Sequence, residues 1–338
     1  QEYWDVMPGL RGDLFGPGDR AGYLAAKVEP TEVRATIHAH AEFEAFAATV
    51  RGIFAAWREA NIEAMRSFDK GHHPTDLIHG LSEDLLARFR EAPLVDAYDA
   101  YQHIMTYWSE MMQDDAYQIT SEGWDVAKVI RELVKDADGK FTEEPDIVLG
   151  SGRGAKKLKA EVIPPALIVA RYFAAEQAEV DELEAKAEEL GRQLEELEEE
   201  HSGEDGLLVE AQTDAGKLTA ASVKARLKAI KGDADAKEEL AVLRQWSALS
   251  VEQGEATRAF KEAQAELNAL VVKQYAKLPD SDAKALVVED KWTSSLAATI
   301  EGELDSVAQG LTARIKTLTE RYAAPLPLLN ENVANLEA

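Results

Sequence analysis

The sequence has no cysteine and few basic residues. Without cysteine there is no disulfide framework, thiolate nucleophile or cysteine-ligated metal, which suits a reducing compartment and leads us to expect a cytoplasmic protein. No run of about 18 apolar residues is present, so we expect no membrane-spanning helix and no membrane partner. The first twenty residues also lack the basic start and apolar middle of a signal peptide.

The charge balance is strongly acidic. The chain holds 37 Lys and Arg residues against 63 Asp and Glu residues, a formal net charge of −26 at pH 7. Because phosphate binding needs clustered Lys and Arg, this balance argues against a chain that grips a nucleic-acid backbone by itself, and it favours basic protein partners. At 338 residues, 46% of them hydrophobic, the chain is long enough for two domains and a sizeable core.

The first third predicts an arm followed by helices. Residues 1–30 are rich in Gly and Pro, which indicates a linker-like arm of turns and short extended pieces. Residues 31–115 predict a compact helical domain, in which Ser82 and Asp96 are candidate N-caps. A stripe at helical spacing predicts a core-facing helix over residues 41–68. The stripe consists of Phe43, Phe46, Val50, Phe54, Trp57 and Met65. A second stripe indicates core packing rather than a ligand-binding shelf. It consists of Tyr98, Tyr101, Met105, Trp108 and Met112.

Residues 116–162 predict a small mixed α/β segment. The runs AYQIT, from residue 116, and DIVLG, from residue 146, have strand composition. The run WDVAKVIRELVKDA, from residue 124, has the pattern of a helix.

Residues 163–280 predict a long antiparallel coiled-coil hairpin. Apolar residues at alternating steps of three and four indicate one long helix from Phe173 to His201, whose other faces are crowded with Glu. A return helix with heptad spacing follows over residues 234–278, after a short basic helix that precedes Gly232. Such a narrow stripe needs a partner, because isolated helices are marginal in water. The predicted seam consists of Val180, Leu183, Leu190, Leu194, Leu197, Trp246, Leu249, Phe260, Leu267 and Leu270.

Residues 281–338 predict a C-terminal helical segment. An apolar stripe from Leu296 to Tyr322 indicates one helix over residues 291–323, and Pro325 and Pro327 would stop it. The expected fold is therefore mainly α: a compact helical domain with a small β element, then the hairpin and a C-terminal helix.

A glycine-rich stretch lies next to the main basic patch that the sequence indicates. Gly150, Gly152 and Ala155 formally fit a dinucleotide-binding pattern, but two prolines at 164 and 165 interrupt where a full helix is needed. We therefore predict no cofactor site. The neighbouring basic residues fit a solvated hairpin turn best, and they are also the candidates for contact with nucleic-acid phosphate. They are Arg153, Lys156, Lys157 and Lys159.

Other constellations do not indicate chemistry. The histidines His38, His40, His72, His73 and His79 have no known metal-ligand spacing, so surface or capping roles are favoured. Acidic pairs such as Asp114 with Asp115 read as solvated charge, and no catalytic motif stands out. We predict no catalytic, cofactor-binding or metal-binding residue in this segment.

Three runs carry a resemblance to a known family. They are LSEDLLARFREAPLVDAYDAYQHIMTYWSEMMQDDAYQI over residues 81–119, IPPALIVARYFAAEQ over 163–177, and RYAAPLPLL over 321–329. Together with the acidic heptad region, they resemble the part that follows the catalytic domain in modification (M) subunits of type I restriction-modification systems.

The resemblance implies a role in assembly. Such subunits are adenine-specific DNA methyltransferases that use S-adenosylmethionine, yet the Asn-Pro-Pro-aromatic motif of the family is absent here and the glycines near residue 150 lie in the wrong part of the family's order. No catalytic or cofactor residue is carried over, and we expect the chain to be the C-terminal half of such a subunit. The implied partners are the DNA-specificity subunit, a second modification subunit, the restriction subunit in the full complex, and DNA mainly through the complex.

The acidic charge also admits a different class of function. A free-standing acidic helical protein, such as an antirestriction mimic of DNA, would carry a similar negative charge. Residual methyltransferase activity is a third reading, which predicts binding of S-adenosylmethionine. The heptads favour the assembly role, because an apolar seam provides affinity for other helices and charges select the partner.

Overall fold

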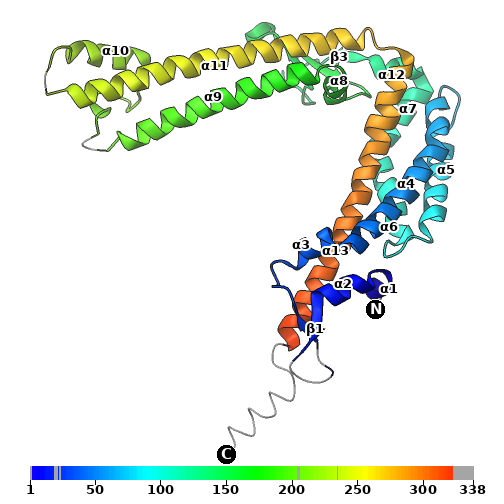
Figure 1. Ribbon diagram of the computed structural model, residues 1–338. Coiled ribbons are helices and arrows are strands. Elements are labelled where there is room, and N and C mark those ends of the chain that lie inside the picture. The colour runs from blue at the N-terminus through cyan, green and yellow to red at the C-terminus, as the bar shows by residue number, and fades with distance from the viewer. Residues whose placement is uncertain (1, 19–21, 23, 204–205, 234, 323–338) are drawn as a thin grey trace, which may run out of the picture. The chain divides into compact units, whose positions relative to one another are not determined.

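The computed structural model describes residues 2–18, 22, 24–203, 206–233 and 235–322, with the backbone but not the side chains of Arg153 and Tyr322. The chain is mainly helical with two small sheets, which confirms the predicted fold class (Figure 1). It divides into two compact units. The first comprises residues up to Ala127 and the described residues from Pro279 onward, and the second is Lys128–Leu278.

The first unit begins with two short helices, α1 (Glu2–Val6) and α2 (Pro8–Leu14). A hairpin of β1 (Phe15–Pro17) and β2 (Leu24–Ala26) follows. The prediction of turns and extended pieces is wrong for residues 2–14, most of which are helical. Met7, Leu10 and Leu14 share one helical face and are fully buried, and this burial outweighs the neighbouring glycines. The Glu42 carboxylate accepts hydrogen bonds from Gly9 N and Leu10 N, both at 3.0 Å, at the start of α2.

The core of this unit is built on α4 (Ala41–Ser67), preceded by α3 (Val33–Ala39). The helix expected over 41–68 is confirmed, and every residue of its predicted stripe is buried. His40 caps α4, because its Nδ1 accepts a hydrogen bond from Glu42 N at 3.1 Å. The buried Trp57 donates its indole N–H to Leu81 O at 3.0 Å, which joins α4 to α5 (Pro74–Phe89).

Two predicted N-caps had different outcomes. Asp96 caps α6 (Ala97–Tyr107), accepting a hydrogen bond from Tyr98 N at 2.8 Å. Ser82 does not begin a helix; it is buried in the middle of α5, which starts at Pro74. Pro74 supplies the preset backbone angle at a helix start, so the turn at Gly71 is followed by one continuous helix.

A π-helical turn, Trp108–Met112, joins α6 to α7 (Gln113–Glu122). The strand predicted for residues 116–120 is therefore wrong. The buried face of this long helical segment includes Ala100, Ile104, Trp108 and Met112 and continues to Ala116 and Ile119. Trp108 and Met112 were expected in the core, whereas Tyr98 is 71% exposed and the other two members of that stripe are half-buried.

The C-terminal part of the unit returns to the N-terminal helices. It comprises α12 (Asp280–Ala285), a π-helical segment (Leu286–Thr293) and α13 (Ser294–Tyr322). The predicted helix over residues 291–323 is confirmed as the end of this segment, and α13 packs on α3, α4 and α6. The predicted stop at Pro325 and Pro327 lies outside the described residues.

The second unit begins with a small antiparallel sheet. After a 3-10 turn (Trp124–Lys128) come β3 (Ile130–Glu132), β4 (Ile147–Leu149), a 3-10 turn (Gly152–Gly154) and β5 (Lys156–Ala160), in the order β3-β5-β4. The strand predicted at residue 146 is confirmed as β4. The helix predicted from residue 124 is wrong, because Ile130–Glu132 pair with β5 instead.

The rest of the unit is the predicted hairpin. It comprises α8 (Pro165–Tyr172), α9 (Ala174–Glu200), a 3-10 turn (Val209–Ala211), α10 (Ala220–Ala229) and α11 (Lys237–Tyr275). Figure 1 shows α9 and α11 running side by side, with α10 at the far end. None of the helices that the structure describes combines the length and apolar character needed to cross a membrane.

Candidate partner-binding surfaces

Most of the predicted seam lies inside the hairpin. Val180, Leu190, Leu197, Trp246 and Leu267 are buried, in keeping with the packing of α9 against α11. The half-buried members of the predicted seam are Leu183, Leu194, Leu249 and Phe260. The two arms are thus each other's partner, as a heptad stripe on each arm requires.

The seam leaves the predicted register near the base of α11. Leu270 is 36% exposed, so its assignment to the seam is wrong, and the buried positions are instead Leu267, Val271 and Tyr275. Buried residues spaced by four, such as these, stay on one side of a straight helix over a few turns. A strict heptad spacing stays in contact with a partner helix only if the two helices supercoil. Tyr275 marks the end of the seam, because its hydroxyl donates a hydrogen bond to Ile163 O. Burial raises the pKa of Tyr275.

The far end of the hairpin has a small core of its own, which we call the tip cluster. Trp246 belongs to it, and its indole N–H donates a hydrogen bond to Glu198 Oε1 at 2.7 Å. This cluster covers the last apolar residue of α9, so the seam is closed at the tip as well. Its buried members are Leu197, Leu208, Ala211, Val223, Ile230, Leu243 and Trp246.

An open groove lies between α11 and the β4 end of the sheet. It encloses about 710 Å³ and is lined from the sheet by Val148, Gly150 and Ser151. Asn268 donates its side-chain N–H to Val148 O at 3.2 Å, which ties the helix to the sheet at one end of the groove. Its floor is largely apolar or small, and Arg258 and Lys261 also line it. The α11 residues include Gly254, Thr257, Phe260 and Ala265.

Of the four basic residues predicted as part of a turn, three lie on β5, the central strand of the sheet, and we call Lys156, Lys157 and Lys159 the strand lysines. The side chain of the fourth, Arg153, lies outside the described part of the structure. Lys156 Nζ lies 3.2 Å from Glu132 Oε2, and Lys159 Nζ lies 2.7 Å from Asp146 Oδ1. Lys157 Nζ lies 4.3 Å from the centroid of the Phe141 ring. The predicted hairpin turn is confirmed over residues 150–155, which join the antiparallel strands β4 and β5, but the three lysines lie on the strand that follows the turn. Each strand lysine has a partner within the unit.

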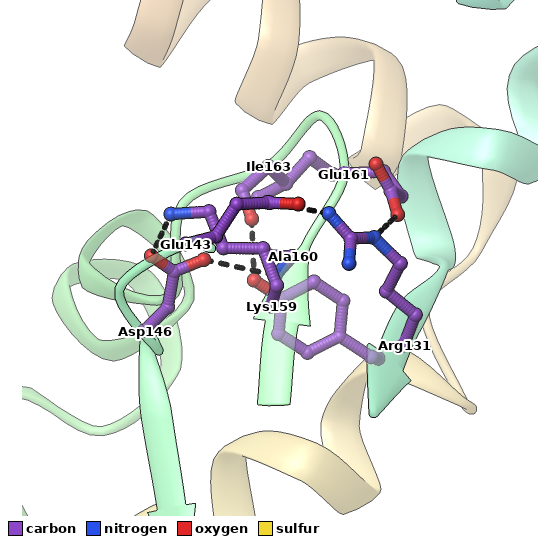
Figure 2. Close-up of polar contacts among 8 residues, drawn as sticks. Arg131, Glu143, Asp146, Lys159, Ala160, Glu161 and Ile163 are labelled. Atoms are coloured by element: carbon purple, nitrogen blue, oxygen red, sulfur yellow. Dashed lines mark hydrogen bonds and ion pairs between the residues drawn. The ribbon is translucent and has the colours of Figure 1, made fainter. Parts of the chain in front are cut away.

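In a polar cluster around these strands, two cations pair with three carboxylates (Figure 2). Arg131 lies between Glu161, to which Nε donates, and Glu143, whose Oε2 is 2.5 Å from Nη2. Asp146 accepts from Lys159 and also from Ala160 N at 2.9 Å. The hydrogen bond with Glu143 is the main cause that raises the pKa of Arg131. The cluster fastens the strands to one another.

The glycine-rich stretch does not form the turn of a dinucleotide site. Gly150 and Gly152 have φ of 80° and 66°, which favour glycine, and Ala155 follows the short 3-10 turn. The next element is β5 rather than a helix. The helix N-terminus that would face a pyrophosphate in such a motif is therefore missing from this place.

The histidines make local contacts. His40 is the cap of α4, and His38 Nε2 lies 3.3 Å from Asp305 Oδ1. His72, His73 and His79 are exposed. Within the part of the chain that the structure describes, no three His, Asp or Glu residues form a group that could hold a metal ion.

One charged pair in the first unit was missed by the sequence analysis. Asp115 is only 3% exposed, and its carboxylate accepts from Lys291 Nζ at 2.6 and 2.8 Å and from Trp292 Nε1 at 2.8 Å. Reading it as solvated charge was wrong. Burial raises the pKa of Asp115, while Lys291 acts in the opposite direction. The partners are far apart in sequence, so no local pattern signals the pair.

Comparison with known proteins leaves the family open. No protein-family model matches the chain, and no curated protein or solved structure is significantly similar to it. Its role must be inferred from the surfaces described above.

Proposed function

We propose that this chain is the C-terminal assembly module of a type I modification subunit, and that it docks a DNA methyltransferase onto the helices of a DNA-specificity subunit. The observation that carries the proposal is the long hairpin, whose arms pack along their seam, with an open groove between α11 and the β4 end of the sheet. A closed hairpin is a stable support that can present a surface to another protein. The resemblance over residues 81–119 and 163–177 supports the choice of partner.

The groove on α11 is the surface that we assign to this docking. Gly254 and Ala265 leave room for the backbone of a neighbouring helix, and Phe260 offers a half-buried aromatic surface. The filled seam does not offer such a site, because a helix that entered it would have to displace the opposite arm. In the full complex, the second modification subunit and the restriction subunit join the assembly, and DNA is met mainly through it.

The test is co-purification with the cognate DNA-specificity subunit. Ala265→Arg places a long charged side chain in the groove, and we expect it to weaken capture at least about tenfold, because an interface centre tolerates an unpaired charge poorly. Ala248→Arg is the matched control, since Ala248 is also exposed on α11 but does not line the groove. Equal capture of both variants would contradict the assignment of the groove.

Substitution of the seam leucines is not a useful test of docking. Leu190 and Leu197 are buried between the arms, so aspartate at these positions would unfold the hairpin and weaken capture by any surface. Failure of the unaltered chain to bind the specificity subunit would contradict the proposed function itself. Displacement of DNA from an unrelated basic protein by the chain would instead favour an acidic DNA mimic.

A further inference from the structure

One segment at the tip of the hairpin, residues 217–231, is basic although the chain as a whole is acidic. Between Lys217 and Lys231 the sequence has five basic residues and no acidic one, within a chain of net charge −26. The adjoining arm, α9, is crowded with glutamate. Asp214 and Asp233 bound the basic segment on either side. A local positive charge in such a chain needs a physical explanation.

Helix α10 holds this segment in one orientation. Thr219 and Ser222 form a reciprocal capping box, with Ser222 N donating to Thr219 Oγ1 and Thr219 N donating to Ser222 Oγ, both at 3.1 Å. Val223 and Ile230 are buried in the tip cluster, which fixes the apolar face of the helix. Arg226 is paired with Glu239, to which it donates two hydrogen bonds at 2.6 and 3.1 Å.

The four remaining basic residues face solvent, and we call Lys217, Lys224, Lys228 and Lys231 the tip lysines. Within the described ranges 24–203, 206–233 and 235–322, no carboxylate lies at ion-pair distance from any of them. Lys224 and Lys228 are one helical turn apart and therefore project from the same face of α10. The tip lysines differ in this respect from the strand lysines, each of which has a partner.

We propose that the tip lysines bind the phosphodiester backbone of duplex DNA, without reading its bases. The other exposed residues of α10 are alanines: Ala220, Ala221, Ala225 and Ala229. The centres of protein interfaces are depleted in Lys and Ala and are anchored by aromatic residues, Met or Arg, which this face lacks in the described residues. Lysines on a smooth face suit phosphate contacts, which position a protein without specifying sequence.

The acidic arms limit but do not abolish this attraction. At an ionic strength of about 0.1 M, exposed charges more than about 10 Å apart are largely screened from one another. Carboxylates several turns down α9 therefore act weakly on a phosphate at α10. Asp214 and Asp233, at the ends of the basic segment, reduce the attraction more, whereas the tip lysines act at contact distance. Binding by the chain alone is expected to be weak and to depend strongly on salt.

The experiment measures binding of the full chain to a short fluorescein-labelled duplex by anisotropy, at several salt concentrations between about 50 and 200 mM. The test variant is Lys224→Gln, Lys228→Gln and Lys231→Gln combined. The control combines Lys261→Gln, Lys273→Gln and Lys277→Gln, which are exposed and remove the same three charges elsewhere. We expect the tip variant to bind at least about tenfold more weakly, with a salt slope smaller by about one for each lost phosphate contact.

Three results would overturn the proposal. One is the absence of binding by the unaltered chain at the lowest salt. A second is equal affinity of the tip and control variants, which would reduce the effect to net charge. The third is equal or tighter binding of polyglutamate by the tip, which would assign this face to an acidic protein. The measurement needs no specificity subunit, so its failure leaves the proposed docking function unaffected.

Discussion

The strand lysines and the tip lysines belong to the same unit and have opposite surroundings. On β5, each lysine meets a carboxylate or an aromatic ring from another part of the same unit. None of the tip lysines has a carboxylate at ion-pair distance among the described residues, whereas Arg226 on the same helix is paired with Glu239. A basic run in a sequence therefore does not show whether its charge is available to a ligand. The strand lysines contact partners within their own unit, whereas the tip lysines are exposed to solvent.

The largest effect is expected where a paired charge is fully buried. Asp115→Ala leaves Lys291 buried without its carboxylate partner, and we expect a loss of about 3–5 kcal/mol in the free energy of unfolding. Chemical denaturation measures this loss. Asp114→Ala is the control, because Asp114 is exposed and its removal should change stability by less than about 0.5 kcal/mol. Equal losses of stability from the two variants would contradict the burial of the Asp115–Lys291 pair.

The next effect concerns the core on which the tip lysines depend. Leu243 is fully buried in the tip cluster, and Leu243→Ala should cost about 2–5 kcal/mol and speed amide hydrogen exchange in α10. Leu270→Ala makes the same chemical change on α11 at a side chain that is 36% exposed, so it should cost much less. If both variants left exchange in α10 unchanged, the tip would not be organised by its own core.

A smaller effect compares one lysine from each group. Lys159→Gln removes the ion pair with Asp146, and we expect a loss of about 1 kcal/mol because both side chains are partly buried. Lys228→Gln removes an exposed lysine and should leave stability within about 0.5 kcal/mol of the original. Denaturation of both variants in parallel tests the contrast, and a larger loss from Lys228→Gln would reverse it.

The smallest effect belongs to an exposed pair. The hydrogen bond from Arg51 lowers the pKa of Glu301 below its ordinary value of 4.5. Because the folded pKa is lower than the unfolded one, the stabilisation is present above about pH 4.5 and is lost as the pH falls through the folded value. We expect only a few tenths of a kcal/mol, since both side chains are about half exposed. The difference in stability between the unaltered chain and Glu301→Gln, followed with pH, should shrink at acid pH. A constant difference would contradict the pairing.

Periodic patterns predicted the long elements well. The stripe from Phe43 to Met65 identified α4, and the heptads identified both arms of the hairpin, because a repeated apolar spacing is a property of the local sequence. Leu270 was misplaced because the buried face of α11 proceeds by steps of four at its base. Residues 116–120 were wrongly predicted as a strand from their composition. They belong to α7, which continues the helix of α6 after the π-helical turn.

The partners of charged residues could not be predicted in this way. Lys159 meets Asp146 through strand pairing, and Asp115 meets Lys291 through packing of helices that are distant in sequence. Neither contact leaves a local signature. The basic composition of the segment that contains α10 is visible in the sequence, but its significance depends on Arg226 being paired and the tip lysines being exposed.

The division of the lysines is tested most directly by brief acetylation of the native chain, read by mass spectrometry with and without duplex DNA. In the free chain, Lys224 and Lys228 should react faster than Lys159, whose ammonium group is held by Asp146. Added DNA should protect Lys224 and Lys228 and leave Lys159 unchanged. Equal rates in the free chain, or protection of the strand lysines instead of the tip lysines, would contradict the account.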